Sequence, residues 1–452
     1  MKHHTTLLNE LNAAMCARHH TYENLFWTSY MGDPSVDEQM VQAQLAVDSF
    51  RSDRALSAQV DEALETASGE ERDALRDWQT FFSCYQAPEA LMPLRKEILD
   101  LEAQIQKSQA QQQEGYVDPY TGDFVSASRG KMRMMVSTED DEAVRKACFE
   151  GMEVISIARV KAQLQLVPLR NEYARALGYE DFYAYRLHVG EGMSKDELFA
   201  IFDDIYQQTK YAFDDVRELE KKQLALREPW NRDYMLAGDS TSKQDPFMQF
   251  DDALLRWGRS FAALGIEYQG ATLQLDLVTR KEKYDNGFCH WPTLVHFTDG
   301  VRKPGAANFT CNVVPGQVGS GARAYTTLFH EGGHAAHLTN VETAQVCMNH
   351  EYAPLSAAWA ETHSMFLDAM QTSPEWMTRY AKDAAGNPYP FSLYEEEVRS
   401  TASVRPLAMM SIMMVAEFER ILYEADELSE AFVLQTARDV TQKYTDYASD
   451  SH

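Results

Sequence analysis

Two histidines and a glutamate in the second half of the chain have the types and spacing of a metal site. Residues 327–337 read TLFHEGGHAAH, in which His330 and His334 are four positions apart and Glu331 directly follows the first histidine. Positions i and i+4 of a helix lie on one face, so both imidazoles can reach one ion. Glu331 is placed to address a water on that ion rather than the ion itself. The motif therefore predicts a helix that holds one Zn²⁺ through His330 and His334, with Glu331 as catalytic base.

A catalytic zinc site also needs a third protein ligand and an open fourth position. His337 is one turn further along the same helix and would strain a tetrahedral site, so we expect it behind the ligands or at the surface. Glu351 and Glu361 are the open candidates by chemistry alone. The stretch SAAWAETHSMFLDAM at 356–370 predicts a helix on which Glu361 and Asp368, seven apart, share a face. Such a helix could supply one ligand and one carboxylate that holds the other N–H of a histidine.

The motif TLFHEGGHAAH, followed by AETHSMFLD, resembles the thimet oligopeptidase and oligoendopeptidase F family of zinc peptidases. Three upstream segments are also similar: RNEYARALGYEDFYAYRL, FDDALLRWGRSFAALGI and LDLVTRKEKYDNGFCHWP. The resemblance covers roughly the second two-thirds of the chain. It implies that Glu361 is the third zinc ligand and that Asp368 orients a ligand. Gly332 replaces a bulkier residue of the family. Two glycines in one helical turn cost about 1 kcal/mol each, which predicts close approach by backbone or substrate.

The resemblance implies a mainly α, two-lobed, zincin-like fold of the gluzincin kind. Its deep cleft would admit short peptides but not folded proteins. The protein would then be a metalloendopeptidase or oligopeptidase with one Zn²⁺ per chain. By similarity, the strand at 307–313 would pair with the substrate backbone along one wall of the cleft. The substrate-binding candidates are therefore Ala307, Asn308, Phe309 and Thr310, although the pattern alone is equally compatible with an internal strand.

The resemblance further implies a tyrosine that stabilises the oxyanion, in a loop that also carries a histidine. No matching loop precedes His452, and Tyr444 and Tyr447 lie on a predicted helix instead. We therefore expect a member that is incomplete at its C-terminal end, binds zinc and turns over poorly. Two other readings stay open. One is a helical HExxH carboxypeptidase of the Taq type or a dipeptidase like angiotensin-converting enzyme, and the other is an inactive zinc-binding fragment.

Apolar residues recur at helical spacing over most of the sequence. One region differs, because residues 272–314 favour strands separated by glycines and so predict a small antiparallel sheet next to the motif helix. The mainly α chain is expected to comprise an N-terminal helical lobe, 1–190, and a catalytic region, 191–452. Helices are predicted at 6–30, 35–50, 70–84, 88–113, 140–177, 194–227, 250–264 and from 326 onward, with a hairpin or loop at 115–130 and irregular chain at 229–246.

The amino-acid composition and the net charge restrict the classes of partner that the protein can bind. The 452 residues are 44% hydrophobic and 25% charged, which is typical of a globular protein, and the formal net charge is −27. This charge argues against nucleic acid and anionic membranes as partners. No signal peptide or membrane-spanning run is evident, and six scattered cysteines without a CxxC pair suit reduced thiols. We therefore expect a cytoplasmic enzyme that acts on short peptides. The methionines at 409–414 have the spacing of core residues.

Overall fold

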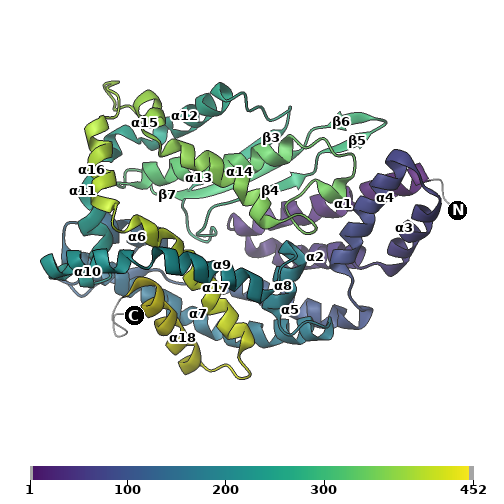
Figure 1. The fold of residues 1–452 in the computed structure, drawn as a ribbon, viewed down its shortest axis with the longest axis horizontal. Coiled ribbons are helices and arrows are strands. Elements are labelled where there is room, and N and C mark those ends of the chain that lie inside the picture. The colour runs from purple at the N-terminus through teal and green to yellow at the C-terminus, as the bar shows by residue number, and fades with distance from the viewer. Residues whose placement is uncertain (1–3, 447–452) are drawn as a thin grey trace.

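Helices form most of the structure, a computed structural model that describes residues 4–446 (Figure 1). Four helices form the N-terminal part, at one end of the molecule: α1 (His4–Tyr30), α2 (Asp37–Arg51), α3 (Arg54–Thr66) and α4 (Gly69–Tyr85). The long helices α5 (Met92–Gln111) and α7 (Glu142–Ala176) follow, together with the hairpin β1 (Gly115–Val117) and β2 (Phe124–Ser126) and the helices α6 (Arg129–Thr138), α8 (Phe182–Glu191), α9 (Lys195–Thr209), α10 (Ala212–Lys222) and α11 (Asp239–Gln244).

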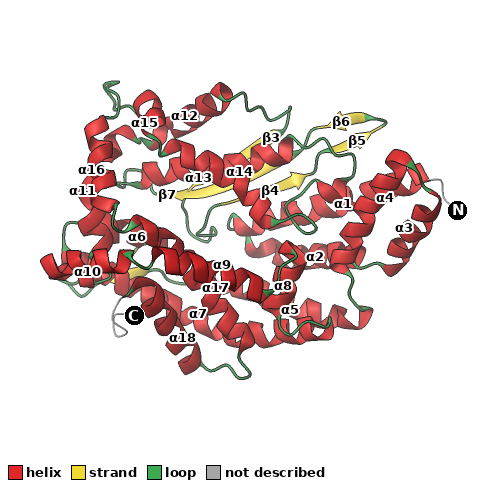
Figure 2. Ribbon diagram, in the orientation of Figure 1, coloured by secondary structure: helices red, strands yellow, loops and turns green. Residues whose placement is uncertain are grey.

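The remaining elements surround a small sheet (Figure 2). They are α12 (Phe250–Ala263), β3 (Thr272–Val278), β4 (Phe288–Thr293), β5 (His296–Thr298), β6 (Val301–Lys303), β7 (Ala306–Val313), α13 (Ser320–Thr339), α14 (Ala357–Gln371), α15 (Pro374–Tyr380), α16 (Phe391–Thr401), α17 (Ala408–Glu424) and α18 (Glu430–Thr445). The predicted mainly α class is therefore confirmed, and most predicted helices lie within a few residues of their observed bounds.

One predicted helix is broken. Ser194 begins α9 with the expected capping box, in which its hydroxyl accepts from the Glu197 amide and the Glu197 carboxylate accepts from the Ser194 amide. The helix predicted to run to residue 227 instead ends at Thr209, and the chain turns before α10. The turn allows Phe213 to join Met410 of α17 in a buried cluster. The same cluster contains Met413, and Met414 packs against it, so these methionines belong to a hydrophobic core, whereas Met409 is exposed.

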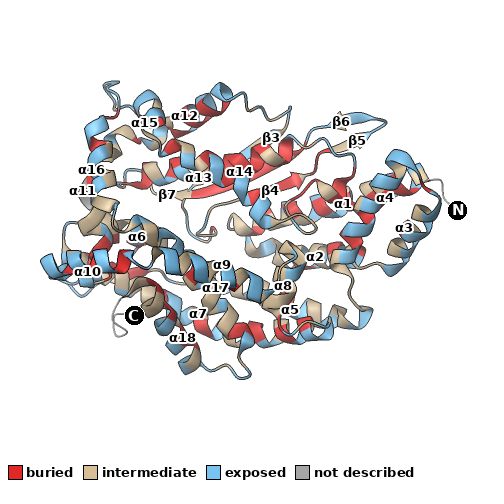
Figure 3. Ribbon diagram, viewed as in Figure 1, coloured by how far each residue is buried: buried red, intermediate tan, exposed pale blue. Residues whose placement is uncertain are grey.

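The sheet before the motif helix is mixed rather than antiparallel, which corrects the prediction. Its strand order is β3-β7-β4, with β3 parallel to β7 and β4 antiparallel to it. The difference arises because β4 and the hairpin β5–β6 separate β3 from β7 in the chain, while β7 lies between β3 and β4 in the sheet. Helix α13 packs against β7 and β4, and α1 contacts β4. Figure 3 shows the buried residues concentrated along α13 and β7.

Hydrophobic clusters cross the predicted boundary at residue 190 in both directions. Leu11 of α1 and Trp78 of α4 share a core with Trp291 of β4 and Leu338 of α13. In the other half of the molecule, Val160 of α7 packs with residues of α17 and α18. The division into 1–190 and 191–452 stays a prediction, and the site region rests on helices from both sides of it.

Two further features bear on the predictions from composition. Within residues 4–446, no helix combines the length and the apolar character needed to cross a membrane. All six cysteines are free thiols. Tyr444 lies on α18 as predicted, whereas Tyr447 and the residues after it, which also enter the prediction of an incomplete C-terminal end, lie outside the described residues.

Candidate metal centre

The two motif histidines project from α13 toward Glu361 on α14. His330 Nε2 lies 3.3 Å and His334 Nε2 lies 3.6 Å from the same oxygen, Glu361 Oε2. One ligand atom from each of the three residues can be chosen so that all lie within 4.8 Å of one another. The Glu361 side chain is about half exposed, so the group is open on one side. The geometry thus joins three side chains that the sequence assigned to one ion.

Close packing of α13 on α14 depends on the glycines of the motif. A Cβ atom at Gly333 would lie 2.8 Å from the Cα of Ser364 on α14. A Cβ at Gly332 would lie 2.5 Å from Nε1 of Trp257 on α12. Both contacts are closer than side chains tolerate, so only glycine allows the helices to approach this far. The close approach predicted for this turn is therefore made by protein atoms and brings Glu361 to the histidines.

A second set of carboxylates holds the other ring nitrogens. His330 Nδ1 lies 2.9 Å from Asp368 Oδ2, which is the orienting contact expected of Asp368. His334 Nδ1 lies 3.0 Å from Glu351 Oε2, and Glu351 Oε1 lies 2.8 Å from His337 Nδ1. Glu351, a candidate ligand by chemistry alone, therefore lies on the Nδ1 side of His334, and His337 contacts the same carboxylate. These contacts fix both imidazoles with Nε2 toward Glu361.

The buried carboxyl of Glu331 lies beside this group rather than in it. Burial raises its pKa to about 7; the nearby imidazoles oppose this shift, and Glu361 and Glu351 add to it. The side chain borders a cavity of about 260 Å³ whose lining also includes Gly287, at the start of β4, and Thr327. A carboxyl with a pKa near neutrality suits proton transfer at physiological pH.

The negative charge of the carboxylates around the two imidazoles favours the binding of a cation. Burial alone would lower the pKa of each histidine, but hydrogen bonding to carboxylates raises the pKa of His330 and raises that of His334 to about 10. The same imidazoles hold the pKa of Glu361 well below its usual range. Four carboxylates thus surround two imidazoles, and this surplus of negative charge would be compensated by a bound divalent ion.

The comparisons with known proteins agree with this geometry. Residues 269–452, which hold every residue of the candidate centre, match the profile of peptidase family M3. This part of the chain belongs to family M3. The protein is accordingly a metallopeptidase, and the predicted family is confirmed. No curated protein matches the sequence.

Solved structures share the fold of this M3 peptidase at low sequence identity. The protein named BsuCP is 14% identical, with 98% of this chain and 78% of that chain covered and a TM-score of 0.59. A protein from Bacillus anthracis strain Ames, assigned as an oligoendopeptidase F, is 14% identical over 95% of this chain and 81% of that one, with a TM-score of 0.54. Another protein assigned as an oligoendopeptidase F is 13% identical over 97% and 79%, with a TM-score of 0.58.

The prediction that β7 of the M3 region pairs with the substrate backbone is wrong. β7 lies between β3 and β4, so both of its edges already carry main-chain hydrogen bonds and cannot accept a peptide. The free edge of β4 is partly occupied as well, because His19 and His20 of α1 lie 2.8 and 3.0 Å from the carbonyl oxygens of Trp291 and Pro292. Three of the four predicted substrate-binding side chains are 0% exposed and the fourth is 4% exposed: Ala307, Phe309, Thr310 and Asn308.

Sequence reasoning missed the residues that support Glu351. The neighbouring Tyr352 donates a hydrogen bond of 3.2 Å to Glu23 of α1, which is buried and also lies 2.9 Å from His290 of β4. This contact ties the segment after α13 to the first helix of the chain. A buried glutamate beside a histidine was the available signal, but its partners are more than 260 residues away and no spacing rule connects them.

Proposed function

We propose that this M3 peptidase hydrolyses peptide bonds in short peptides with one Zn²⁺ held by His330, His334 and Glu361. The observation that carries the proposal is the convergence of both Nε2 atoms on one Glu361 oxygen, with the Glu331 carboxyl beside them. Two imidazoles and one carboxylate are a usual ligand set of catalytic zinc, which leaves a further position for water or substrate.

The residues fit the ion on two counts. The Nδ1 atoms of both histidines are engaged by Asp368 and Glu351, so the Nε2 atoms remain available. The surrounding carboxylates supply the negative charge that a divalent cation requires. When bound, zinc lowers the pKa of a coordinated water and polarises a carbonyl.

Glu331 would perform the proton transfers. Its carboxylate would accept a proton from the attacking water and later deliver that proton to the amine that leaves. Burial supports this role, because a pKa of about 7 lets the group both take up and release a proton near neutral pH. The role requires no direct bond to the metal, which agrees with the position of Glu331 outside the three-residue group.

Short peptides are the proposed substrates. The centre borders a cavity of about 260 Å³, and a larger one of about 930 Å³ lies beside the start of α14. Both sizes suit an extended segment of a few residues rather than a folded protein. The free thiols of the six cysteines fit a reducing compartment, so the cytoplasm is the proposed location.

The proposal is tested by separating metal binding from turnover. Glu361→Gln should lose zinc, whereas Glu331→Gln should keep it and lose hydrolysis of an internally quenched nonapeptide. Glu342→Gln, a change at an exposed carboxylate, is the matched control and should keep both. Equal zinc content in the Glu361 and Glu342 variants would remove Glu361 from the site. Absence of turnover by the zinc-loaded wild type would favour the inactive zinc-binding alternative.

A further inference from the structure

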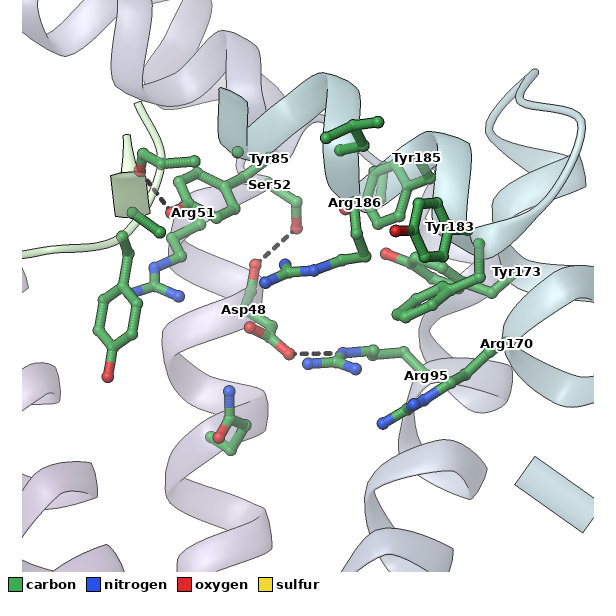
Figure 4. A pocket seen from close by; sticks show the side chains of 18 of the residues that line it. Asp48, Arg51, Ser52, Tyr85, Arg95, Arg170, Tyr173, Tyr183, Tyr185 and Arg186 are labelled. Atoms are coloured by element: carbon green, nitrogen blue, oxygen red, sulfur yellow. Dashed lines mark hydrogen bonds and ion pairs between the residues drawn. The ribbon is translucent and has the colours of Figure 1, made fainter. Parts of the chain in front are cut away.

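A large cavity next to the metal centre is walled by arginines and tyrosines (Figure 4). It measures about 930 Å³ and lies among α2, α5, α7, α8, α17 and the segment 351–357 that leads into α14. Figure 4 shows Arg186 and Arg95 extending toward Asp48 from different helices. The centre and the cavity are adjacent through α14, because Ala357 lines the cavity and Glu361 follows one turn later.

Two of the four arginines in the wall are neutralised. Arg95 Nε lies 2.9 Å from Asp48 Oδ2, and Arg170 lies 2.6 Å from Glu102. Another lining carboxylate is also occupied, since Glu191 accepts from the Ala357 amide at 2.8 Å at the start of α14. Two further carboxylates line the wall: Glu351 contacts His334 and His337, and Glu419 is influenced electrostatically by Arg170 rather than by the remaining two arginines.

Arg51 and Arg186 form no ion pair with any residue between 4 and 446. Arg51 lies over the rings of Tyr85 and Tyr352, at 4.8 and 5.5 Å, and its Nε is buried without a hydrogen-bond partner. Arg186 is exposed to the cavity and makes no hydrogen bond to the described part of the chain. Both guanidinium groups act electrostatically on Tyr85, so both lie in the neighbourhood of that phenol. Two arginines without an ion pair in one cavity are unusual in a chain with a net charge of −27.

Phenols complete a surface that can donate hydrogen bonds. Burial raises the pKa of Tyr85, Tyr173 and Tyr183 to about 12, so all three keep their protons at neutral pH. The Tyr85 hydroxyl already donates to the Ala353 carbonyl, whereas those of Tyr173 and Tyr183 have no acceptor among residues 4–446. Guanidinium and phenol groups together can satisfy the several lone pairs of an anion.

We propose that this cavity binds a carboxylate of the peptide substrate through Arg186 and Arg51. The inference rests on the proposed peptidase function and specifies its substrate further. A planar guanidinium matches a carboxylate with two parallel hydrogen bonds. One turn of α14 separates Ala357 from Glu361, which is about 6 Å along the axis. An extended peptide covers this span with about two residues. The edge of the cavity at Ala357 therefore lies about two extended residues from the centre, and a carboxylate bound in the cavity lies at or beyond that distance from the bond that is cut.

The bound carboxylate could be the C-terminus of the peptide or an acidic side chain near it. A C-terminal carboxylate would make the enzyme prefer short peptides with a free end, cut at a fixed distance from that end. An acidic side chain would instead select for sequence. The C-terminus and an acidic side chain present the same carboxylate group to the two arginines, so the experiment must distinguish these two sources.

The test measures binding separately from turnover. Zinc-loaded Glu331→Gln protein is titrated against a pentapeptide labelled at its N-terminus, and fluorescence anisotropy reports the Kd. Three forms of the peptide are compared: a free acid without acidic side chains, the same peptide amidated, and an amidated peptide with glutamate at the last position. The free acid should bind about ten- to a hundredfold more tightly than the neutral amide, the range of a charge-assisted hydrogen bond. Tight binding of the amidated glutamate peptide alone would identify the side chain as the source.

Variants assign the effect to the cavity. In the same background, Arg186→Gln should remove most of the preference and leave the Kd of the neutral amide unchanged. Arg186→Lys should keep part of the preference, because the lysine ammonium retains the positive charge as a point charge without the planar guanidinium. Arg76→Gln, at an exposed arginine of α4 outside the cavity, is the matched control and should keep the full preference. Arg51→Gln provides a second, independent position.

Either of two results would overturn the inference. One is equal affinity, or no detectable binding, for the acid, the neutral amide and the glutamate amide. The other is a preference that persists in both Arg186→Gln and Arg51→Gln. Neither depends on catalysis. Hydrolysis without carboxylate preference would refute only this inference, whereas carboxylate-dependent binding without hydrolysis by the wild type would refute only the proposed function.

Discussion

Replacing Gly333 with alanine should weaken metal binding without contact with the metal. The new Cβ would lie 2.8 Å from Ser364 Cα, 3.2 Å from the His363 carbonyl oxygen and 3.3 Å from Leu367 Cδ1. Two of these atoms are backbone and cannot rotate away. Ordinary contact begins at 3.4 Å, so α13 and α14 would have to separate by about 0.6 Å. Metal–ligand distances tolerate only about 0.2 Å, so Glu361 would be displaced beyond what the proposed site accepts.

The stability change should be small by comparison. Overpacking costs about 1–3 kcal/mol, and replacing a helical glycine returns about 1 kcal/mol, which gives a net loss of about 0–2 kcal/mol. Gly258→Ala is the matched control, because a Cβ there meets nothing within 4 Å on helix α12. That variant should be stabilised and bind zinc normally.

Competition with a chromophoric zinc chelator measures the affinity, and thermal unfolding of the metal-free proteins measures stability. The Gly333 variant should stay folded and bind zinc about ten- to a hundredfold more weakly, the range found for changes behind metal ligands. Wild-type affinity in this variant would show that the spacing of the two helices does not position Glu361. Global unfolding of the variant would show that the loss of stability has been underestimated.

Three further outcomes follow from the residues around the centre. Glu351→Gln should weaken zinc binding by about ten- to a hundredfold, because His334 loses its charged partner; unchanged chelator competition would contradict that support. Glu23→Ala should lower the free energy of unfolding in urea by about 3–5 kcal/mol, since it leaves His290 buried without its partner; a loss below about 1 kcal/mol would refute this. Burial keeps the pKa of His350 well below 6.5, so His350 stays neutral when folded but gains a proton on unfolding as the pH falls below about 6.5. This contribution to stability should therefore be lost from pH 7 to 5, and the wild type should lose more stability over that range than His350→Gln, as measured by denaturant titrations of both proteins at each pH.

The motif helix was predictable because helical geometry alone places His330 and His334 on one face. Helical spacing also placed Glu361 and Asp368 on one face, since seven residues are about two turns, but it left Glu351 and Glu361 both open as the third ligand, and only the family resemblance selected Glu361. Glu351 was not assigned its role, because it lies in a segment between helices whose path no periodicity encodes. Its position depends on Tyr352 and, through Tyr352, on the first helix.

The sheet illustrates a different limit. The alternation of residues identified the strands from 272 to 314, but strand order depends on contacts between distant segments. The sequence of β7 is compatible with an edge strand, but in the structure β7 is the central strand of its sheet. The cavity was beyond sequence reasoning for the same reason, since Arg51 and Arg186 come from α2 and α8 and are brought together only by the packing of the fold.

The contact of α1 with β4 has a consequence for how the protein is made. His19 and the Trp291 carbonyl that it contacts are 272 residues apart in the chain. At a synthesis rate of roughly 5–20 residues per second, the ribosome needs roughly 15–55 s to produce the partner strand after the helix. Throughout that interval the face of α1 that will cover β4 lacks its native partner. During that interval this face of the first helix is open to chaperone binding or to premature association.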